Sequence, residues 1–143
     1  MIVMQKIDVK VDWSGKNYGG GWGNPVLGII LSTGDTWEEF TKDFAEALDF
    51  HIEGMMEHGD QLPQWAVERD YEIEYRMTVS ALLHRALEYS TLEAISRASG
   101  LKRSALKRYA TGVVCPRDAQ SEKILLALKK IVSDLKELAD SMK

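Results

Sequence analysis

A helix, a glycine turn and a basic second helix follow one another in the carboxyl-terminal half, and this order limits the folds open to the chain. Ser90-Thr91-Leu92-Glu93 is a capping-box pattern, which predicts that a helix begins there with Ser90 as its cap. Gly100 then permits a turn. The segment from Lys102 to Arg117 contains five basic residues and no Asp or Glu. Such an order is typical of a helix-turn-helix.

The second of these helices has a basic side that carries no large apolar residue. Its apolar positions and those of the preceding helix fall where a helix-turn-helix buries its contacts; they are Ile95, Leu101, Leu106 and Tyr109. The other positions are free to face a major groove, where Arg reads guanine while Ser and Lys hold phosphates. The alternative is a solvated helix face, since exposed Lys and Arg are common. The predicted DNA-binding residues are Lys102, Arg103, Ser104, Lys107, Arg108 and Arg117.

Charge is divided unevenly along the 143 residues, which have room for one ordinary domain or two small ones. Residues 1–70 carry 5 basic and 13 acidic side chains, whereas residues 71–143 carry 13 basic and 9 acidic ones. Two halves with two different partners are the natural inference. We therefore expect two domains, 1–70 and 71–143, with the link between them near the start of the second.

The first half is predicted to be a small α+β unit. Alternation over residues 6–13 predicts a strand, residues 18–23 can return as a glycine-loosened strand, and 26–31 is predicted to be a third, more buried strand. A long helix should follow, capped by Thr36 or Asp35 and ended by Gly54 or Gly59, and it can cover the sheet. Alternation at residues 71–77 predicts a fourth strand.

The last helix carries an apolar stripe with four-three-four-three spacing, formed by Ile124, Leu128, Ile131, Leu135 and Leu138. This spacing permits pairing with a second copy, which would present two recognition helices to a palindromic site. Packing within its own domain is an equally good explanation for so short a helix. The needs of operator binding favour a homodimer or a higher even oligomer.

Catalytic sites are weakly supported. The acids that a metal-dependent nuclease would need are Asp8, Asp12, Asp35 and Glu38, and solvated charge explains them better. His51 lies on the apolar side of the long helix, where a hydrogen-bonded histidine is expected rather than a general base. The glycines at 19–23 lack the Gly-Lys-Ser/Thr ending of a phosphate loop. We expect no enzymatic activity, no metal and no cofactor.

Four tryptophans are many for so small a first domain. Trp37 is expected in the core, whereas Trp13, Trp22 and Trp65 flank strands and loops. Large aromatic residues anchor interfaces, so these three either meet a partner or fill gaps around glycines.

Localisation is predicted from what the sequence lacks. Cys115 is the single cysteine, which excludes an internal disulfide and fits a reducing compartment. The longest apolar run, Val26 to Leu31, is too short to span a bilayer, and the amino terminus lacks the apolar stretch of a signal peptide. We expect a soluble cytoplasmic protein.

With these parts in order, the chain resembles the HicB antitoxins, the inhibitory half of HicA/HicB toxin-antitoxin pairs. The resemblance rests on Tyr18 in the glycine-rich return, on Ser32-Thr33-Gly34-Asp35-Thr36-Trp37-Glu38-Glu39 at the helix entry, and on Phe50-His51-Ile52-Glu53-Gly54 near its exit. It departs from the family at residues 23–28, where members usually carry a Pro-Gly-Cys-like turn.

The resemblance implies a degenerate ribonuclease H-like amino-terminal domain, an antiparallel sheet covered by a long helix, that binds and masks a small cationic ribonuclease toxin. It also implies autorepression of the operon by an all-helical helix-turn-helix domain. The candidate toxin-contacting residues are Trp13, Tyr18, Trp22 and Trp65. The alternative function is a helix-turn-helix transcription regulator whose first domain senses a small molecule or oligomerises.

Overall fold

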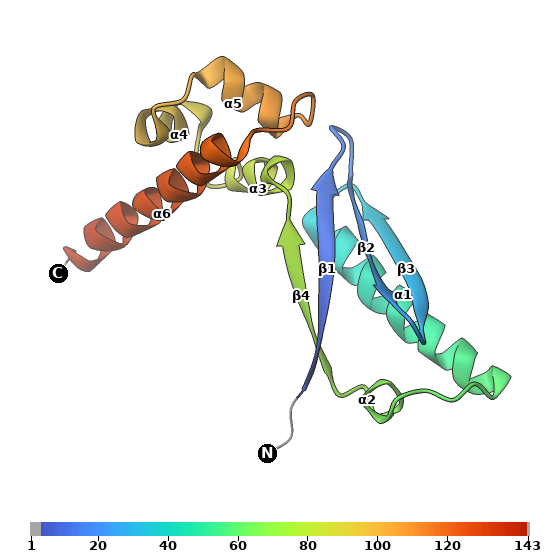
Figure 1. The fold of residues 1–143 in the computed structure, drawn as a ribbon. Coiled ribbons are helices and arrows are strands. Elements are labelled where there is room, and N and C mark those ends of the chain that lie inside the picture. Colours follow the sequence, from blue (N-terminus) through green and yellow to red (C-terminus); the bar gives the residue numbers. More distant parts are fainter. Residues whose placement is uncertain (1–3, 143) are drawn as a thin grey trace. The chain divides into compact units, whose positions relative to one another are not determined.

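The computed structural model describes residues 4–142, which form four strands and six helices (Figure 1). They divide into two compact units, residues 4–78 and 79–142. The boundary therefore lies eight residues after the expected division at 70/71, because the strand over residues 71–77 is part of the first sheet.

The sheet of the first unit has the strand order β3-β2-β1-β4. Strands β1 (Gln5–Trp13), β2 (Tyr18–Asn24) and β3 (Gly28–Gly34) form an antiparallel meander, and β4 (Tyr71–Met77) pairs with β1 in parallel. The expectation of an antiparallel sheet is wrong for β4. The chain crosses over through helix α1 (Trp37–His58), so it re-enters the sheet in the direction of β1.

Alternation in β1 correctly predicts its two faces, since Ile7, Val9 and Val11 are at most 1% exposed while the charged residues between them face solvent. The predicted bounds of the third strand are wrong. The side chain of Asn24 accepts hydrogen bonds from the amides of Val26 (2.8 Å) and Leu27 (3.0 Å), which turns the chain before β3 begins.

The close pairing of β1 and β2 leaves no space for a side chain at Gly20. A Cβ atom on Gly20 would overlap the carbonyl oxygen of Lys10, whereas one on Gly19 would meet nothing within 4 Å. Position 20 of β2 therefore requires glycine, whereas position 19 has room for a side chain.

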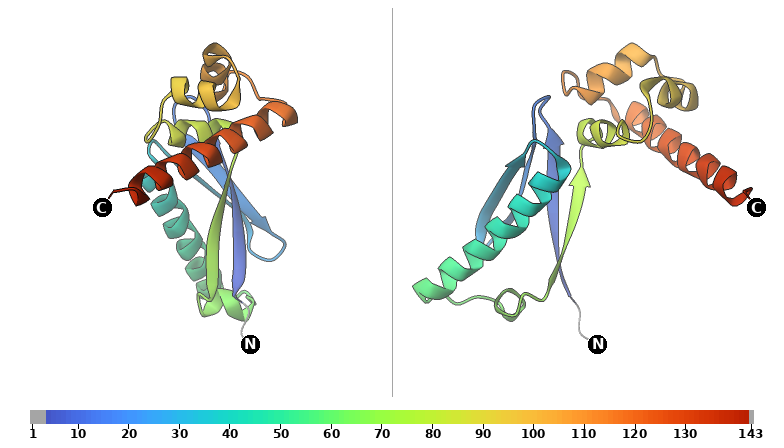
Figure 2. Two further views of the ribbon diagram at one scale, coloured as in Figure 1. Left: turned by 90° about the vertical axis from the view of Figure 1, so that its left-hand side faces the viewer. Right: turned by 180° about the vertical axis from the view of Figure 1, so that it is seen from behind.

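Helix α1 lies across one face of the sheet (Figure 2). Its cap is Thr36, whose hydroxyl accepts the amide of Glu39 at 3.1 Å, and it ends at Gly59 with a positive φ of 87°. These two of the four predicted end residues are confirmed. Its buried stripe repeats every four residues and consists of Phe40, Phe44, Leu48 and Ile52.

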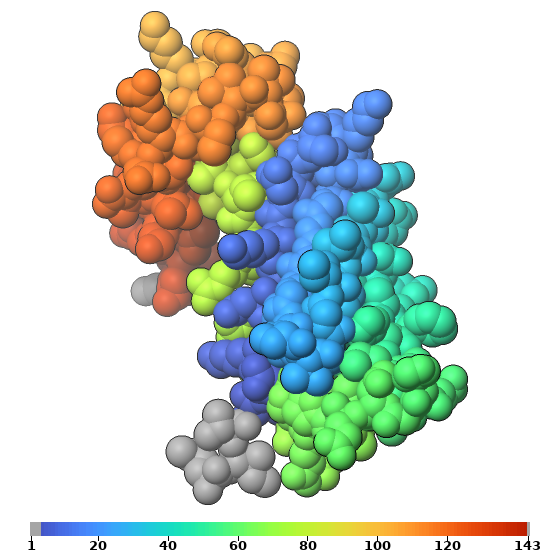
Figure 3. Space-filling view, turned by 45° about the vertical axis from the view of Figure 1, so that its right-hand side comes forward, coloured from blue at the N-terminus to red at the C-terminus, as the bar shows by residue number. Residues whose placement is uncertain are grey.

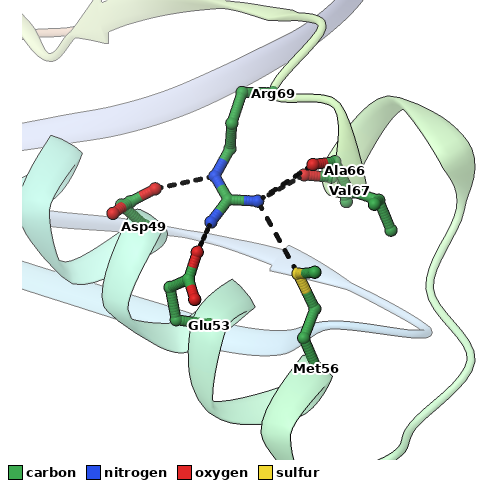
Figure 4. Close-up of polar contacts among 6 residues, drawn as sticks. All are labelled: Asp49, Glu53, Met56, Ala66, Val67 and Arg69. Carbon is green, nitrogen blue, oxygen red and sulfur yellow. Dashed lines mark hydrogen bonds and ion pairs between the residues drawn. The ribbon is translucent and has the colours of Figure 1, made fainter.

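Arg69 fastens the short helix α2 (Gln64–Val67) and the following turn to α1 (Figure 4). Its guanidinium lies 2.7 Å from the carboxylate of Asp49 and 2.6 Å from that of Glu53, and it donates to the carbonyl of Ala66 at 2.9 Å. Asp49 is the main cause of the raised pKa of Arg69. These contacts hold Arg69 at φ 57°, a left-handed conformation that side chains other than glycine seldom adopt.

The second unit is all-helical, with α3 (Val79–Ala86), α4 (Leu92–Ser99), α5 (Arg103–Ala110) and α6 (Asp118–Asp140). One apolar cluster joins all four helices, and its buried members are Leu83, Ile95, Leu106, Ala110 and Ile124. Within residues 4–142, no helix combines the length and the apolar character needed to cross a membrane.

Candidate nucleic-acid interface

Helix α4 starts one residue later than its sequence pattern predicts. Thr91 is the cap, and its hydroxyl accepts the amide of Ala94 at 3.1 Å. The prediction of Ser90 as cap is wrong, because the amide of Ser90 donates to the carbonyl of Ala86 at 2.9 Å and so belongs to the turn that ends α3. Glu93 consequently has no capping-box partner and turns to Arg103.

The link between α4 and α5 is short and held at both ends. Gly100 adopts φ 77°, the left-handed conformation that ends α4, and its amide donates to the carbonyl of Ser96. The hydroxyl of Ser96 donates to the carbonyl of Leu101 at 2.5 Å, and the amide of Leu101 donates to the hydroxyl of Ser99 at 3.1 Å. The predicted turn at Gly100 is confirmed, and the small Ser96 sits where the turn folds back.

One side of α5 is fixed to the core of its unit. Leu106 is fully buried, Ala110 is buried, and Leu101 and Tyr109 are partly buried against the same cluster. Ser80 on α3 donates from its hydroxyl to the carbonyl of Tyr109 at 2.6 Å. The predicted apolar positions are confirmed, and they determine which side of α5 is left for solvent.

We call the exposed side of α5 and its cap the basic face; it consists of Lys102, Arg103, Ser104, Lys107 and Arg108. Arg117 is also exposed, but it lies outside α5, at the N-cap position of α6. All six predicted DNA-binding residues are therefore on the surface of the second unit. Four of the five members of the basic face bring a positive charge, which suits an anionic ligand.

One carboxylate lies beside the basic face. The Arg103 guanidinium is 2.6 Å from the carboxylate of Glu93, and both side chains are 56% exposed. A hydrogen bond from its own backbone amide, together with that from Arg103, lowers the pKa of Glu93. An ion pair so exposed adds little stability, so Arg103 can exchange Glu93 for a phosphate at small cost.

The other cations of the predicted site are free. Among residues 4–142, no carboxylate lies within 4 Å of the charged nitrogens of Lys102, Lys107, Arg108 or Arg117. Thr111, which sequence reasoning missed, is exposed and follows Lys107 by four residues, so it continues the same side of the helix. Its hydroxyl donates to the carbonyl of Lys107 at 3.0 Å and keeps its lone pairs for an incoming donor.

The aromatic residues assigned to a partner in the first unit separate into two groups. Trp13 and Tyr18 are only 8% and 1% exposed and meet edge to face, with ring centroids 4.9 Å apart. They are core residues, so the expectation that they form a contact surface is wrong for the folded unit. Trp22 and Trp65 contact each other edge to face, with ring centroids 6.3 Å apart. Both side chains are half-buried, so part of each ring is accessible.

Two of the four acids considered for nuclease chemistry have individual partners. Asp8 lies 3.4 Å from Arg76, and Asp12 accepts the hydroxyl of Thr78 at 2.6 Å. Asp35 and Glu38 lie at the start of α1. In residues 4–142, no three His, Cys, Asp or Glu side chains are placed to share a metal ion.

His51 is half-buried, and its Nε2 atom hydrogen-bonds the carbonyl of Leu27. This contact joins α1 to the turn before β3. The expectation of a hydrogen-bonded histidine is confirmed.

No known family model matches the chain, and neither a curated protein nor a solved structure matches it. What the protein does must therefore be inferred from the geometry of its two units and from the charge that each unit carries.

Proposed function

We propose that this chain is an antitoxin of the HicB type, which neutralises a HicA-like ribonuclease toxin through its first unit and represses its own operon through its second. The observation that carries the proposal is the register of α4, Gly100 and α5. The turn and the buried residues leave one side of α5 exposed, and that side is basic.

The dimensions of α5 fit the proposed role. An α-helix with its side chains is about 10–12 Å in diameter, and the major groove of duplex DNA is about 12 Å wide, so α5 can lie in it. Arg103 and Arg108 are the candidates for reading base edges, while Lys102, Lys107 and Arg117 are the candidates for holding phosphates. Thr111 is a further candidate for a phosphate contact.

The first unit supports the antitoxin half of the proposal through its arrangement and its charge. A sheet covered on one face by a long helix is what a degenerate ribonuclease H-like domain would present. Residues 1–78 carry 6 basic and 15 acidic side chains, a balance that speeds encounter with a cationic protein and disfavours anionic ones.

A homodimer is part of the proposal because α6 extends beyond the core of its own unit. Ile124 and Ala127 near its start are buried, whereas Val132, Leu135 and Leu138 are 65%, 56% and 67% exposed. Apolar side chains this exposed on one helix favour pairing with a second copy.

One observation favours the alternative of a regulator that senses a small molecule. The face of the sheet away from α1 has an open groove of about 620 Å³, which passes over Gly19, Gly20 and Gly21 and is bordered by Ile29 and Leu31. Its volume suits a small ligand.

Co-expression with the short basic protein encoded beside this chain distinguishes the two functions. The antitoxin proposal expects the two proteins to co-purify and the growth arrest caused by the basic protein to be relieved. Removal of residues 79–143 should abolish operator binding and keep at least part of that relief, because the first unit has its own core. If the full chain neither binds the basic protein nor relieves the arrest, the antitoxin proposal is wrong.

A further inference from the structure

The two edges of the sheet differ in how they are protected. β4 forms one edge and carries Glu72, Glu74 and Arg76, whereas β3 forms the other and its sequence, Gly-Ile-Ile-Leu-Ser-Thr-Gly, contains no charge and no proline. Proteins usually protect an open edge with lysine, proline or a bulge, because its unpaired amides and carbonyls attract other strands. Among the described residues, β3 pairs only with β2 and has no such protection.

The exposed side of β3 is apolar. Ile29 and Leu31 are 75% and 72% exposed, and both face away from α1. Their neighbours on β2 are Gly23 and Gly21, which have no side chains to cover them. Two large apolar residues side by side on an uncharged edge strand favour a contact with another chain.

Helix α1 lies along the other side of β3, as Figure 3 shows for one face of the first unit. The Ser32 hydroxyl of β3 donates to the carboxylate of Asp43 at 2.7 Å, so Asp43 marks the side of α1 nearest this strand. Phe50 follows Asp43 by two helical turns, lies on the same side and is 80% exposed. Between Trp37 and His58 the helix carries seven acidic residues and one lysine, so Phe50 projects from an acidic surface.

We propose that β3 accepts an extended, basic segment of another protein as an added strand. The backbone of the segment pairs with the open edge of β3. Because side chains alternate along a strand, one set lies beside Ile29 and Leu31 and the other faces α1. The segment therefore alternates apolar residues beside Ile29 and Leu31 with mainly basic residues toward α1, and one residue of the set that faces α1 is apolar or aromatic and covers Phe50.

A second copy of this chain fits the same edge less well. Antiparallel pairing of two β3 strands about a twofold axis would place two α1 helices on one face of the joined sheet. Each helix has an excess of six negative charges between Trp37 and His58, which Arg69 reduces to five, and like charges brought together oppose association. The negative charge of α1 attracts a cationic segment, whereas it repels a second copy of the chain.

The inference rests on the proposed function, since the cationic partner is the toxin of that proposal. The test measures the affinity of the full chain for the co-encoded basic protein by calorimetry. Ile29→Lys with Leu31→Lys should weaken binding at least tenfold, because two cations then lie against the apolar side chains of a segment that is itself positively charged, and Phe50→Ala should also weaken it. Val113→Lys with Met142→Lys is the matched control, since both side chains are exposed (72% and 87%) and belong to the second unit; its affinity should not change.

Hydrogen exchange distinguishes an added strand from a simple contact. In the complex, amides of Gly28–Gly34 that exchange rapidly in the free protein should become protected. An unprotected β3, or unchanged affinity in both the β3 and the Phe50 variants, overturns the added strand while the antitoxin function stands. Failure of the unaltered chain to bind the basic protein overturns both. Self-association of the free chain that disappears in the β3 variant would assign the edge to a second copy and so overturn the inference.

Discussion

Replacing Arg103 and Arg108 by alanine should weaken operator binding but leave its salt dependence nearly unchanged. The proposed site has five exposed cations per chain, of which Lys102, Lys107 and Arg117 are proposed to hold phosphates and Arg103 and Arg108 to read base edges. Each phosphate that a cation neutralises contributes about −0.9 to the slope of log affinity against log salt, so the three phosphate contacts give a slope of about −2.7 per chain. The double variant keeps these three cations and therefore this slope.

The affinity itself should fall steeply, because arginines that contact guanine contribute about 1–3 kcal/mol each. At one salt concentration the double variant should therefore bind the operator more weakly by a factor of at least about 30. Arg103 should account for less of this loss than Arg108, since DNA must first displace Glu93 from Arg103.

Fluorescence anisotropy with a labelled operator duplex, at several salt concentrations, measures both quantities. The control replaces Lys129 and Lys136 by alanine, which removes the same charge from exposed positions of α6. An unaltered affinity in the Arg103 and Arg108 variant, a large change in its slope, or an equal loss of affinity in the control would refute the assignment of the basic face.

Three further outcomes are expected for the stability of the two units. Arg69→Ala should lower the free energy of unfolding of the first unit by about 1–2 kcal/mol in urea denaturation. Arg69→Gly should lower it by about 1 kcal/mol less, because glycine accepts φ 57° freely. Equal losses in the two variants would exclude backbone strain at Arg69. Gly100→Ala should cost the second unit about 1 kcal/mol in thermal unfolding, since φ 77° strains any Cβ, and an unchanged melting temperature would contradict this. Burial lowers the pKa of His84 below 6.5, against the opposing effect of Glu88, so the unfolded chain takes up a proton first as the pH falls. The neutral His84 side chain therefore contributes fully to the free energy of unfolding above about pH 6.5, and this contribution is lost as the pH falls below that value. Between about pH 7.5 and about pH 5.5, the free energy of unfolding should fall less for His84→Gln than for the unaltered chain, and equal losses would argue against this role.

Periodicity predicted most of the fold because burial imposes it. The alternation in β1 and the four-residue repeat in α1 each follow from one buried face, and the structure has both elements close to their predicted bounds. The start of β3 was less predictable, since Val26 and Leu27 are as apolar as a strand requires. The side-chain carbonyl of Asn24 accepts hydrogen bonds from the amides of Val26 and Leu27, so these two residues form a turn and β3 begins after them.

Tertiary contacts explain what sequence reasoning missed at the candidate site. Ser90 and Thr91 are both good helix caps, and only the hydrogen bond that ties Ser90 to α3 selects Thr91. Glu93 lies outside the acid-free segment, yet the turn at Gly100 brings it to Arg103. Glu93 and Arg103 are ten residues apart in the sequence, and no helical or strand spacing predicts an ion pair at that separation.

Composition could not separate buried from accessible aromatic residues. Trp13 and Tyr18 border a turn, as interface residues often do, but their rings complete the core beneath α1. Trp22 and Trp65 have the same kind of sequence neighbourhood and remain partly accessible. Tyr18 and Trp22 lie on the same face of the sheet, so the difference follows from what covers each side chain.

The contact between Gly20 and the neighbouring strand gives a measure of folding that is independent of function. If codon 20 is randomised in a library of the chain fused to a fluorescent folding reporter, and the fluorescent cells are sequenced, only glycine should persist, because every other residue collides with the Lys10 backbone. Codon 19, where a Cβ meets open space, should tolerate many replacements. The contrast between two adjacent codons would report whether this unit adopts its sheet inside living cells, whatever it binds there.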